Sequence, residues 1–269
     1  HMNKTHLFAY VTLAGLSLAA CRKEQEESPN NDYTSAMDNS IGEALFSDVL
    51  KQADDAAKDG GLRASLDGCV DTVIIDMNAM PHTMLIDFGS VNCTGTDGRT
   101  RRGSILVTFT GGYRDAGTVI TITPQNYYVN DYKVQGTKSV TNMGLNQDGH
   151  MYFNVSVAGT ITAPDNSWTS THNATRVRTW IAGEDTGTPF DDVYLISGNG
   201  NGVNRNGIAY TLAILQALRI EIGCPWIVSG SVAITPQDLA VRTVDFGNGS
   251  CDDDISVTVN GNTYYFSGQ

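Results

Sequence analysis

One arrangement of cysteines, apolar runs and an Asp-Phe-Gly triplet occurs twice in this chain. The first copy runs from Cys69 through Asp87-Phe88-Gly89 to Cys93, and the second from Cys224 through Asp245-Phe246-Gly247 to Cys251. In each copy the cysteines stand at the open ends of two apolar runs that can pair as a hairpin. Of the three possible connectivities, the repeat favours Cys69–Cys93 and Cys224–Cys251, each worth roughly 3–4 kcal/mol through loop entropy.

The triplets predict structure rather than chemistry. No glycine-rich phosphate loop or His-Arg-Asp loop accompanies them, so they are not kinase signatures. We expect Phe88 and Phe246 to lie in a core at a strand end, and Gly89 and Gly247 to allow a turn with positive φ. The preceding aspartates would then accept hydrogen bonds from nearby backbone N–H groups.

Strand patterns dominate the chain from residue 68 onward. Short β-branched and apolar runs alternate with turn signals such as Gly111-Gly112 and Asn260-Gly261, and no helix-length segments separate them, so antiparallel pairing is expected. The fold class is mainly β: an antiparallel meander forming one large twisted sheet or half-open barrel. The run at 208–222 also fits an amphipathic helix, but a strand is the favoured prediction.

One helix is expected before the sheet. Apolar residues at three-to-four spacing mark residues 37–58, Asp38 or Ser40 could cap the start, and Gly60-Gly61 would end it. The expected organisation is a cloning remnant and signal peptide at 1–20, a disordered tether at 21–36, the helix at 37–60 and a single β domain at 61–269. The helix should pack its apolar stripe on the sheet.

The charge balance limits the classes of partner that this chain can bind. With a formal net charge of -12, the chain lacks the clustered basic side chains that nucleic acid and anionic headgroups require. Its one basic cluster, Arg99, Arg101 and Arg102, lies among glycine and threonine and is expected to be a solvated loop. No nucleic-acid partner is expected.

The N-terminal segment resembles the signal of a bacterial lipoprotein. An apolar run from Leu7 to Leu18 ends in Leu18-Ala19-Ala20-Cys21, which is similar to a lipobox, and the resemblance implies that Cys21 is acylated and anchors the chain to a membrane. The charged residues after Cys21 resemble export signals that place Bacteroidota lipoproteins on the cell surface; solvated linker charge is the alternative.

The mature chain as a whole resembles the uncharacterised, mostly β outer-membrane lipoproteins of Bacteroidota. The lipobox, the repeated Cys…Asp-Phe-Gly-x-x-x-Cys stretch and the segment Asp192-Val193-Tyr194-Leu195-Ile196-Ser197-Gly198 carry the resemblance. It implies an exported, lipid-anchored protein and no particular activity.

Candidate ligand sites rest on two groups of residues. Aromatic side chains near Asn, Asp and Thr could stack on sugars, although core packing is the favoured reading; they are Tyr127, Tyr128, Tyr132, Trp168 and Trp180. Clustered carboxylates could bind calcium, although neither cluster has EF-hand spacing; they are Asp191 and Asp192, and Asp252, Asp253 and Asp254. No other cofactor is expected.

No catalytic residue can be assigned. His82, His150 and His172 lie in no metal-binding motif, and the cysteines are expected to be oxidised. The leading hypothesis is a non-enzymatic binding or structural role with a protein or glycan ligand. The alternatives are a glycan-processing enzyme that uses the acidic turn at Glu184, Asp185, Asp191 and Asp192, and a carrier that holds an apolar ligand between sheet and helix.

Overall fold

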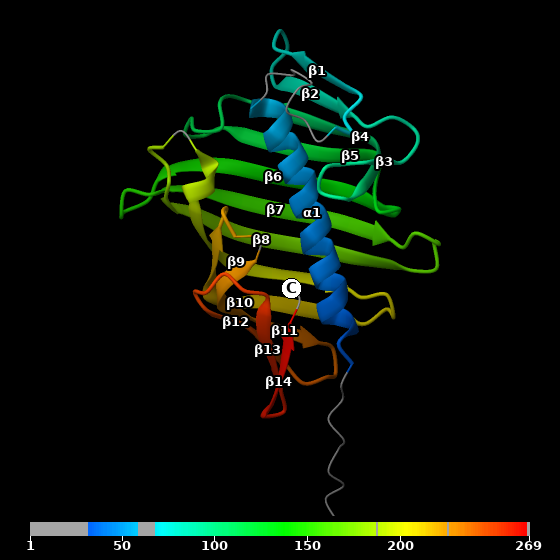
Figure 1. The fold of residues 1–269 in the computed structure, drawn as a ribbon, viewed down its shortest axis with the longest axis vertical. Coiled ribbons are helices and arrows are strands. Elements are labelled where there is room, and N and C mark those ends of the chain that lie inside the picture. The colour runs from blue at the N-terminus through cyan, green and yellow to red at the C-terminus, as the bar shows by residue number, and fades with distance from the viewer. Residues whose placement is uncertain (1–31, 59–67, 187, 225, 268–269) are drawn as a thin grey trace, which may run out of the picture.

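The computed structural model describes residues 32–58, 68–186, 188–224 and 226–267. The signal segment, Cys21 and most of the expected tether lie outside these ranges. One long helix crosses a single large sheet (Figure 1). The elements are α1 Thr34–Lys58, β1 Thr72–Asp76, β2 His82–Asp87, β3 Cys93–Thr94, β4 Thr100–Phe109, β5 Val119–Val129, β6 Tyr132–Leu145, β7 Met151–Thr162, β8 Thr169–Ala182, the short 3-10 helix Pro189–Asp191, β9 Val193–Val203, β10 Ala209–Glu221, β11 Ile227–Pro236, β12 Arg242–Asn248, β13 Asp254–Val259 and β14 Asn262–Ser267.

The sheet follows the order of the chain. Its 14 strands run β1-β2-β4 and then consecutively to β14, with β3 paired to β4 beside this path, and every recorded pair is antiparallel. The mainly β meander with one N-terminal helix is therefore confirmed. Strands β1 and β14 stand at opposite ends of the order, so the sheet is open.

Helix α1 begins earlier than its sequence pattern predicts. The Oδ1 atom of Asp32 accepts a hydrogen bond from the N–H of Thr34 at 2.8 Å, which satisfies one of the free donors at a helix start. Asp38 and Ser40 lie inside the helix, so neither is the cap, and residues 34–36 of the expected tether are helical. Of the predicted apolar stripe, Leu45, Phe46, Val49 and Ala53 are buried, and Ile41 and Leu50 are half-buried.

The two faces of the sheet differ along every strand, because successive side chains point to opposite sides. On the helix face, directly paired residues form a buried row: Met84, Val107, Ile122, Lys138, Val157, Ala174, Gly200, Leu212, Ile234 and Arg242. We call the opposite side, away from α1, the open face.

The ambiguous run at 208–222 is a strand. Strand β10 pairs with β9 on one side and β11 on the other, and these backbone bonds override its helical periodicity. Within the described residues, no helix is both long enough and apolar enough to cross a membrane.

Candidate functional site

Both copies of the repeat fold as disulfide-linked modules. We define the first module as residues 69–109 and the second as residues 224–259. Cys69 is bonded to Cys93 with Cα atoms 5.4 Å apart, and Cys224 to Cys251 with Cα atoms 5.8 Å apart. The predicted pairing is thus the one that the structure has, and each bridge joins the open end of an antiparallel hairpin.

The Asp-Phe-Gly triplets have the same local geometry in both modules. The aspartate Oδ1 accepts a hydrogen bond at 2.8 Å from the glycine N–H two residues later, in Asp87 and again in Asp245. Gly89 has φ of 78° and Gly247 has φ of 85°, values that glycine adopts without steric cost. The register also repeats, since each aspartate is paired with a serine of the next strand, Ser104 or Ser256. The structural interpretation of the triplets is confirmed.

The first module is closed beyond its triplet. The N–H of Phe88 donates to the carbonyl of Gly103 at 2.9 Å, and the N–H of Gly103 donates to the carbonyl of Gly89 at 2.7 Å. Phe88 is 3% exposed and packs on Tyr127, with ring centroids 5.3 Å apart. These contacts bind the triplet to β4 through the backbone and hold the Phe88 ring in the core.

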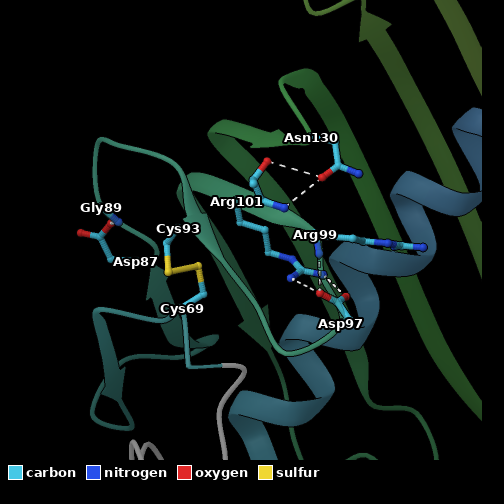
Figure 2. Close-up of a disulfide and its surroundings, with 9 residues drawn as sticks. Cys69, Asp87, Gly89, Cys93, Asp97, Arg99, Arg101 and Asn130 are labelled. Atoms are coloured by element: carbon cyan, nitrogen blue, oxygen red, sulfur yellow. Dashed lines mark hydrogen bonds and ion pairs between the residues drawn. A yellow bond between two sulfur atoms is a disulfide. The ribbon is translucent and has the colours of Figure 1, made fainter.

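A buried ion network ties the first module to α1. The Arg101 guanidinium donates to both oxygens of Asp97, at 3.0 and 2.6 Å (Figure 2). It also donates to Asp48 of α1 at 2.5 Å. The Tyr127 hydroxyl donates to Asp48 Oδ2 at 2.9 Å, and burial raises the pKa of Tyr127. The hydrogen bond from Arg101 lowers the pKa of Asp97 to about 2.

This network corrects the sequence-based expectation for the basic cluster. Arg101 is fully buried, because two carboxylates neutralise a guanidinium that would otherwise be costly to desolvate. Arg102 also lies in β4 rather than in a loop, and its side chain is 25% exposed and paired with Asp131. Arg99 precedes β4 and is 42% exposed, although it too lies within 3.4 Å of Asp48.

The second module is open where the first is closed. The recorded pairing of β12 with β13 ends at Asp245 and Ser256. Beyond that point lies a hollow of about 420 Å³, and its lining consists of Asp245, Gly247, Asp254, Ile255, Ser256, Tyr265 and Phe266. Tyr265 is 83% exposed, so its ring is accessible. Phe266 is 43% exposed, but its ring contacts that of Tyr33, with centroids 6.4 Å apart, and points to the opposite face of the strand.

The hollow combines an aromatic surface with hydrogen-bonding groups in one cross-strand row. Asp245 is paired with Ser256, and Ser256 with Tyr265, so the three side chains lie on the same face at neighbouring strand spacings of about 4.8 Å. No Lys, Arg or His occurs from residue 243 to the end of the sequence. A sugar ring on Tyr265 could therefore donate its hydroxyls to the Ser256 oxygen and the Asp245 carboxylate.

The aromatic residues chosen from the sequence lie elsewhere. Tyr127 is 0% and Trp180 5% exposed, so these two rings offer no face to a ligand. Tyr128 lies under the Arg102 guanidinium, 3.8 Å from its ring centroid. Tyr132 and Trp168 are half-buried and contact each other, and Arg205 covers Trp168 at 4.1 Å. The packing interpretation accounts for all five.

The candidate calcium residues remain apart in two loops. Asp191 accepts a hydrogen bond from the Thr186 hydroxyl at 2.9 Å, and Asp192 from the Tyr194 hydroxyl at 3.3 Å. Burial raises the pKa of Asp192, which disfavours the charge that a metal ligand needs. Asp252 accepts from the N–H of Asp254, the first residue of β13, at 3.2 Å, and Asp253 between them is half-buried. Across the described ranges, no three His, Cys, Asp or Glu side chains come together in a way that could hold a metal.

The helix face of the sheet is filled. Lys138 donates to the Phe46 carbonyl at 3.1 Å, Arg176 pairs with Glu43 at 2.5 Å, and Arg205 pairs with Asp38 at 2.5 Å. The Gly159 position has room for no side chain, because an added Cβ would lie 2.2 Å from the Phe46 ring. Packed side chains thus fill the space between sheet and helix that an apolar ligand would need.

Sequence reasoning missed Tyr265 and Phe266 as site residues. The Asn260-Gly261 hairpin signal predicted their strand, but the aromatic side chains were interpreted only as strand formers. No signal in the sequence separated them from packed strand residues; the structure does so, because β14 stands at one end of the strand order among the described residues.

No protein-family model, no curated protein and no solved structure matches this chain.

Proposed function

We propose that this is a lipid-anchored protein of the outer membrane, exposed at the cell surface, with a non-enzymatic role in binding glycans. The anchor rests on the lipobox-like sequence that ends at Cys21. The binding role rests on one observation: an aromatic ring that is 83% exposed, Tyr265, lines a hollow together with Asp245 and Ser256.

The chemistry of the hollow favours a glycan over other ligands. Exposed aromatic rings offer an apolar surface to the C–H face of a sugar, while carboxylate and hydroxyl oxygens accept its hydroxyl hydrogens. The absence of basic residues after residue 242 removes the partners that a phosphate or sulfate group would need.

The binding test uses the full-length acylated protein in detergent on an array of plant, host and bacterial glycans. Tyr265→Ala removes the ring, and Gln125→Ala is the matched control, because Gln125 is paired with Ser104 in the first module as Tyr265 is with Ser256 in the second. We expect about tenfold weaker binding for Tyr265→Ala, equivalent to about 1.4 kcal/mol, and unchanged binding for Gln125→Ala. An array without signal for the unsubstituted protein would refute the glycan role.

The anchor has its own test. The unsubstituted protein should incorporate labelled palmitate, and the Cys21→Ser variant should not. Labelling that persists in Cys21→Ser would contradict the assignment.

A glycan-processing enzyme is the second candidate, and its support is the pair of carboxylates, Asp245 and Asp254, in the same hollow. Hydrolysis requires an acid and a base or nucleophile on either side of the bond. The glycans that bind should be incubated with the protein and assayed for new reducing ends. Cleavage that is lost in Asp245→Asn but kept in Asp87→Asn, the corresponding change in the first module, would assign the enzymatic role instead.

A further inference from the structure

The hollow lies at one end of a longer row of side chains on the open face. The row beside Asp245, Ser256 and Tyr265 contains Thr243, Thr258 and Thr263, and direct pairing continues it across the sheet. From β2 to β14 its members are Thr83, Thr108, Thr121, Ser139, Ser156, Thr175, Asn199, Ala213, Ala233, Thr243, Thr258 and Thr263. Asp76 of β1 pairs with Thr83 and ends the row on the far side of the sheet.

From β2 to β14 this row is uncharged, in a strongly acidic protein. Between Thr83 and Thr263 it consists of Thr, Ser, Asn and Ala alone, although the chain carries 29 acidic and 17 basic residues, and its one charged member is Asp76 at the β1 end. A neighbouring row has the same character, with Thr137, Ala158, Asn173, Asn201, Thr211 and Thr235. Solvated sheet faces and their edges commonly carry charged side chains that prevent association, so two adjacent rows with so few charges are suited to contact with an uncharged partner.

The centre of the open face is accessible. Ser156, Thr175, Asn199 and Ala213, on four successive strands, are exposed. Two glycines paired with each other, Gly136 and Gly159, form the floor of a second hollow of about 300 Å³ between β6, β7 and β8. Its walls are neutral side chains, Gln135, Thr160, Thr171 and Asn173 among them.

We propose that the ligand is an uncharged polysaccharide, which begins at the Tyr265 hollow and continues across the strands over the open face. This inference rests on the proposed glycan-binding function and specifies its ligand class. The exposed stretch from Ser156 on β7 to Ala213 on β10 covers three strand spacings, about 14 Å, and the half-buried Ser139 and Ala233 extend it by one strand on each side. This length suits an extended chain of several sugars rather than a single terminal unit.

The chemistry of the row excludes two other kinds of partner. An acidic glycan would meet no Lys or Arg in either row, and so would lose its water without gaining an ion pair. A protein partner is usually held by Trp, Tyr or Arg anchors, and these two rows contain none. Hydroxyl and amide groups bind other hydroxyls with only about 0.5–1.5 kcal/mol each, so affinity must come from many contacts along a chain.

The first experiment measures affinity against chain length. Linear gluco- and manno-oligosaccharides of two to ten units, all uncharged, are titrated against the full-length acylated protein in detergent, with oligogalacturonides of the same lengths as the acidic comparison. We expect at least about tenfold tighter binding of the ten-unit chains than of the three-unit chains, and acidic chains at least about tenfold weaker, each factor equivalent to about 1.4 kcal/mol.

The second experiment places the chain on the open face. Thr175→Glu with Asn199→Glu adds two charged side chains at exposed positions far from the hollow, and Ser47→Glu, exposed on α1, is the matched control on the other side of the sheet. The double variant should bind three-unit chains normally and lose the gain from chain length, while Ser47→Glu should keep it.

The outcomes separate this inference from the proposed function. Binding of short chains that depends on Tyr265 but does not strengthen with length supports the glycan role and overturns the polysaccharide. If the double variant still binds longer chains more tightly than short ones, the polysaccharide is also overturned. The same holds if the unsubstituted protein binds an envelope protein through this face and no glycan. Silence of every uncharged probe at every length overturns both.

Discussion

The two disulfide-linked modules share a motif and differ in what surrounds it. In the first module, backbone bonds from Phe88 and Gly103 close the strand beyond the triplet, and Arg101 links it to α1. In the second, the pairing stops at Asp245 and a hollow opens beside an edge strand. The same local turn therefore serves as part of the core in one place and as the wall of a candidate site in the other.

Sequence position explains part of the contrast. Arg102 stands two residues before Ser104 in the first module, and Asp254 stands two residues before Ser256 in the second. Arg102 covers Tyr128 and pairs with Asp131, whereas Asp254 lines the hollow. The remaining difference is topological, because β5 continues to β6 while β14 ends the sheet.

The largest effect is expected from Asp48→Ala. It leaves the fully buried Arg101 with less than its full set of carboxylate partners, and breaking a buried ion pair typically costs about 3–5 kcal/mol. Urea unfolding of this variant should be compared with Asp55→Ala, whose partner Lys51 is 56% exposed and which should cost at most about 0.5 kcal/mol. A small loss for Asp48→Ala would mean that the first module is not held by this network.

Phenylalanine truncation should distinguish the modules directly. Phe88→Ala removes a ring that is 3% exposed and should cost about 3–5 kcal/mol. Phe246 is only half-buried, so Phe246→Ala should cost clearly less. Equal losses in chemical denaturation would show that the second module is packed as tightly as the first.

Removing either disulfide should lower the free energy of unfolding by a similar amount. The bridges close stretches of 24 and 27 residues, for which loop entropy predicts a loss of about 3.5 kcal/mol in each case. Paired Cys→Ser variants of each module, compared by thermal unfolding, test this. A much smaller loss for the second pair would indicate that its edge unfolds before the rest of the sheet.

The smallest effect concerns acid stability of the first module. The folded pKa of Asp97 is lowered from 3.8 to about 2, so the unfolded chain takes up this proton first as the pH falls. The stabilisation is fully present above pH 3.8 and is lost as the pH falls through about 2. Asp97→Asn should lack this component, so its unfolding free energy should depend less on pH between 4 and 2 than that of the unsubstituted protein. Parallel pH profiles would refute the assignment.

Much of the fold could be predicted because it depends on local signals. Alternating runs and glycine turns predicted the meander, three-to-four spacing predicted α1, and the repeat predicted both disulfides and the triplet geometry. The start of α1 was misplaced because Asp32, rather than Asp38, provides the capping oxygen, and Asp38 instead meets Arg205, which is distant in sequence.

The candidate site was predicted less well for the same reason. Tyr127 and Trp180 resemble exposed binding aromatics in sequence, yet pairing and packing bury them. Tyr265 has neighbours of similar polarity but remains exposed, because it lies on the face away from α1 and on a strand that, within the described residues, pairs only with β13.

The sequence by itself determined the strands, the helix and the two stapled turns, since each depends on residues close together in the chain. Only the tertiary structure decided that one copy of the Asp-Phe-Gly turn is closed and the other open. That choice depends on long-range contacts: Asp48 with Arg101 across 53 residues, and the position of the second module beside the last strand. Such contacts are set by how the whole sheet is assembled, and no local pattern encodes them.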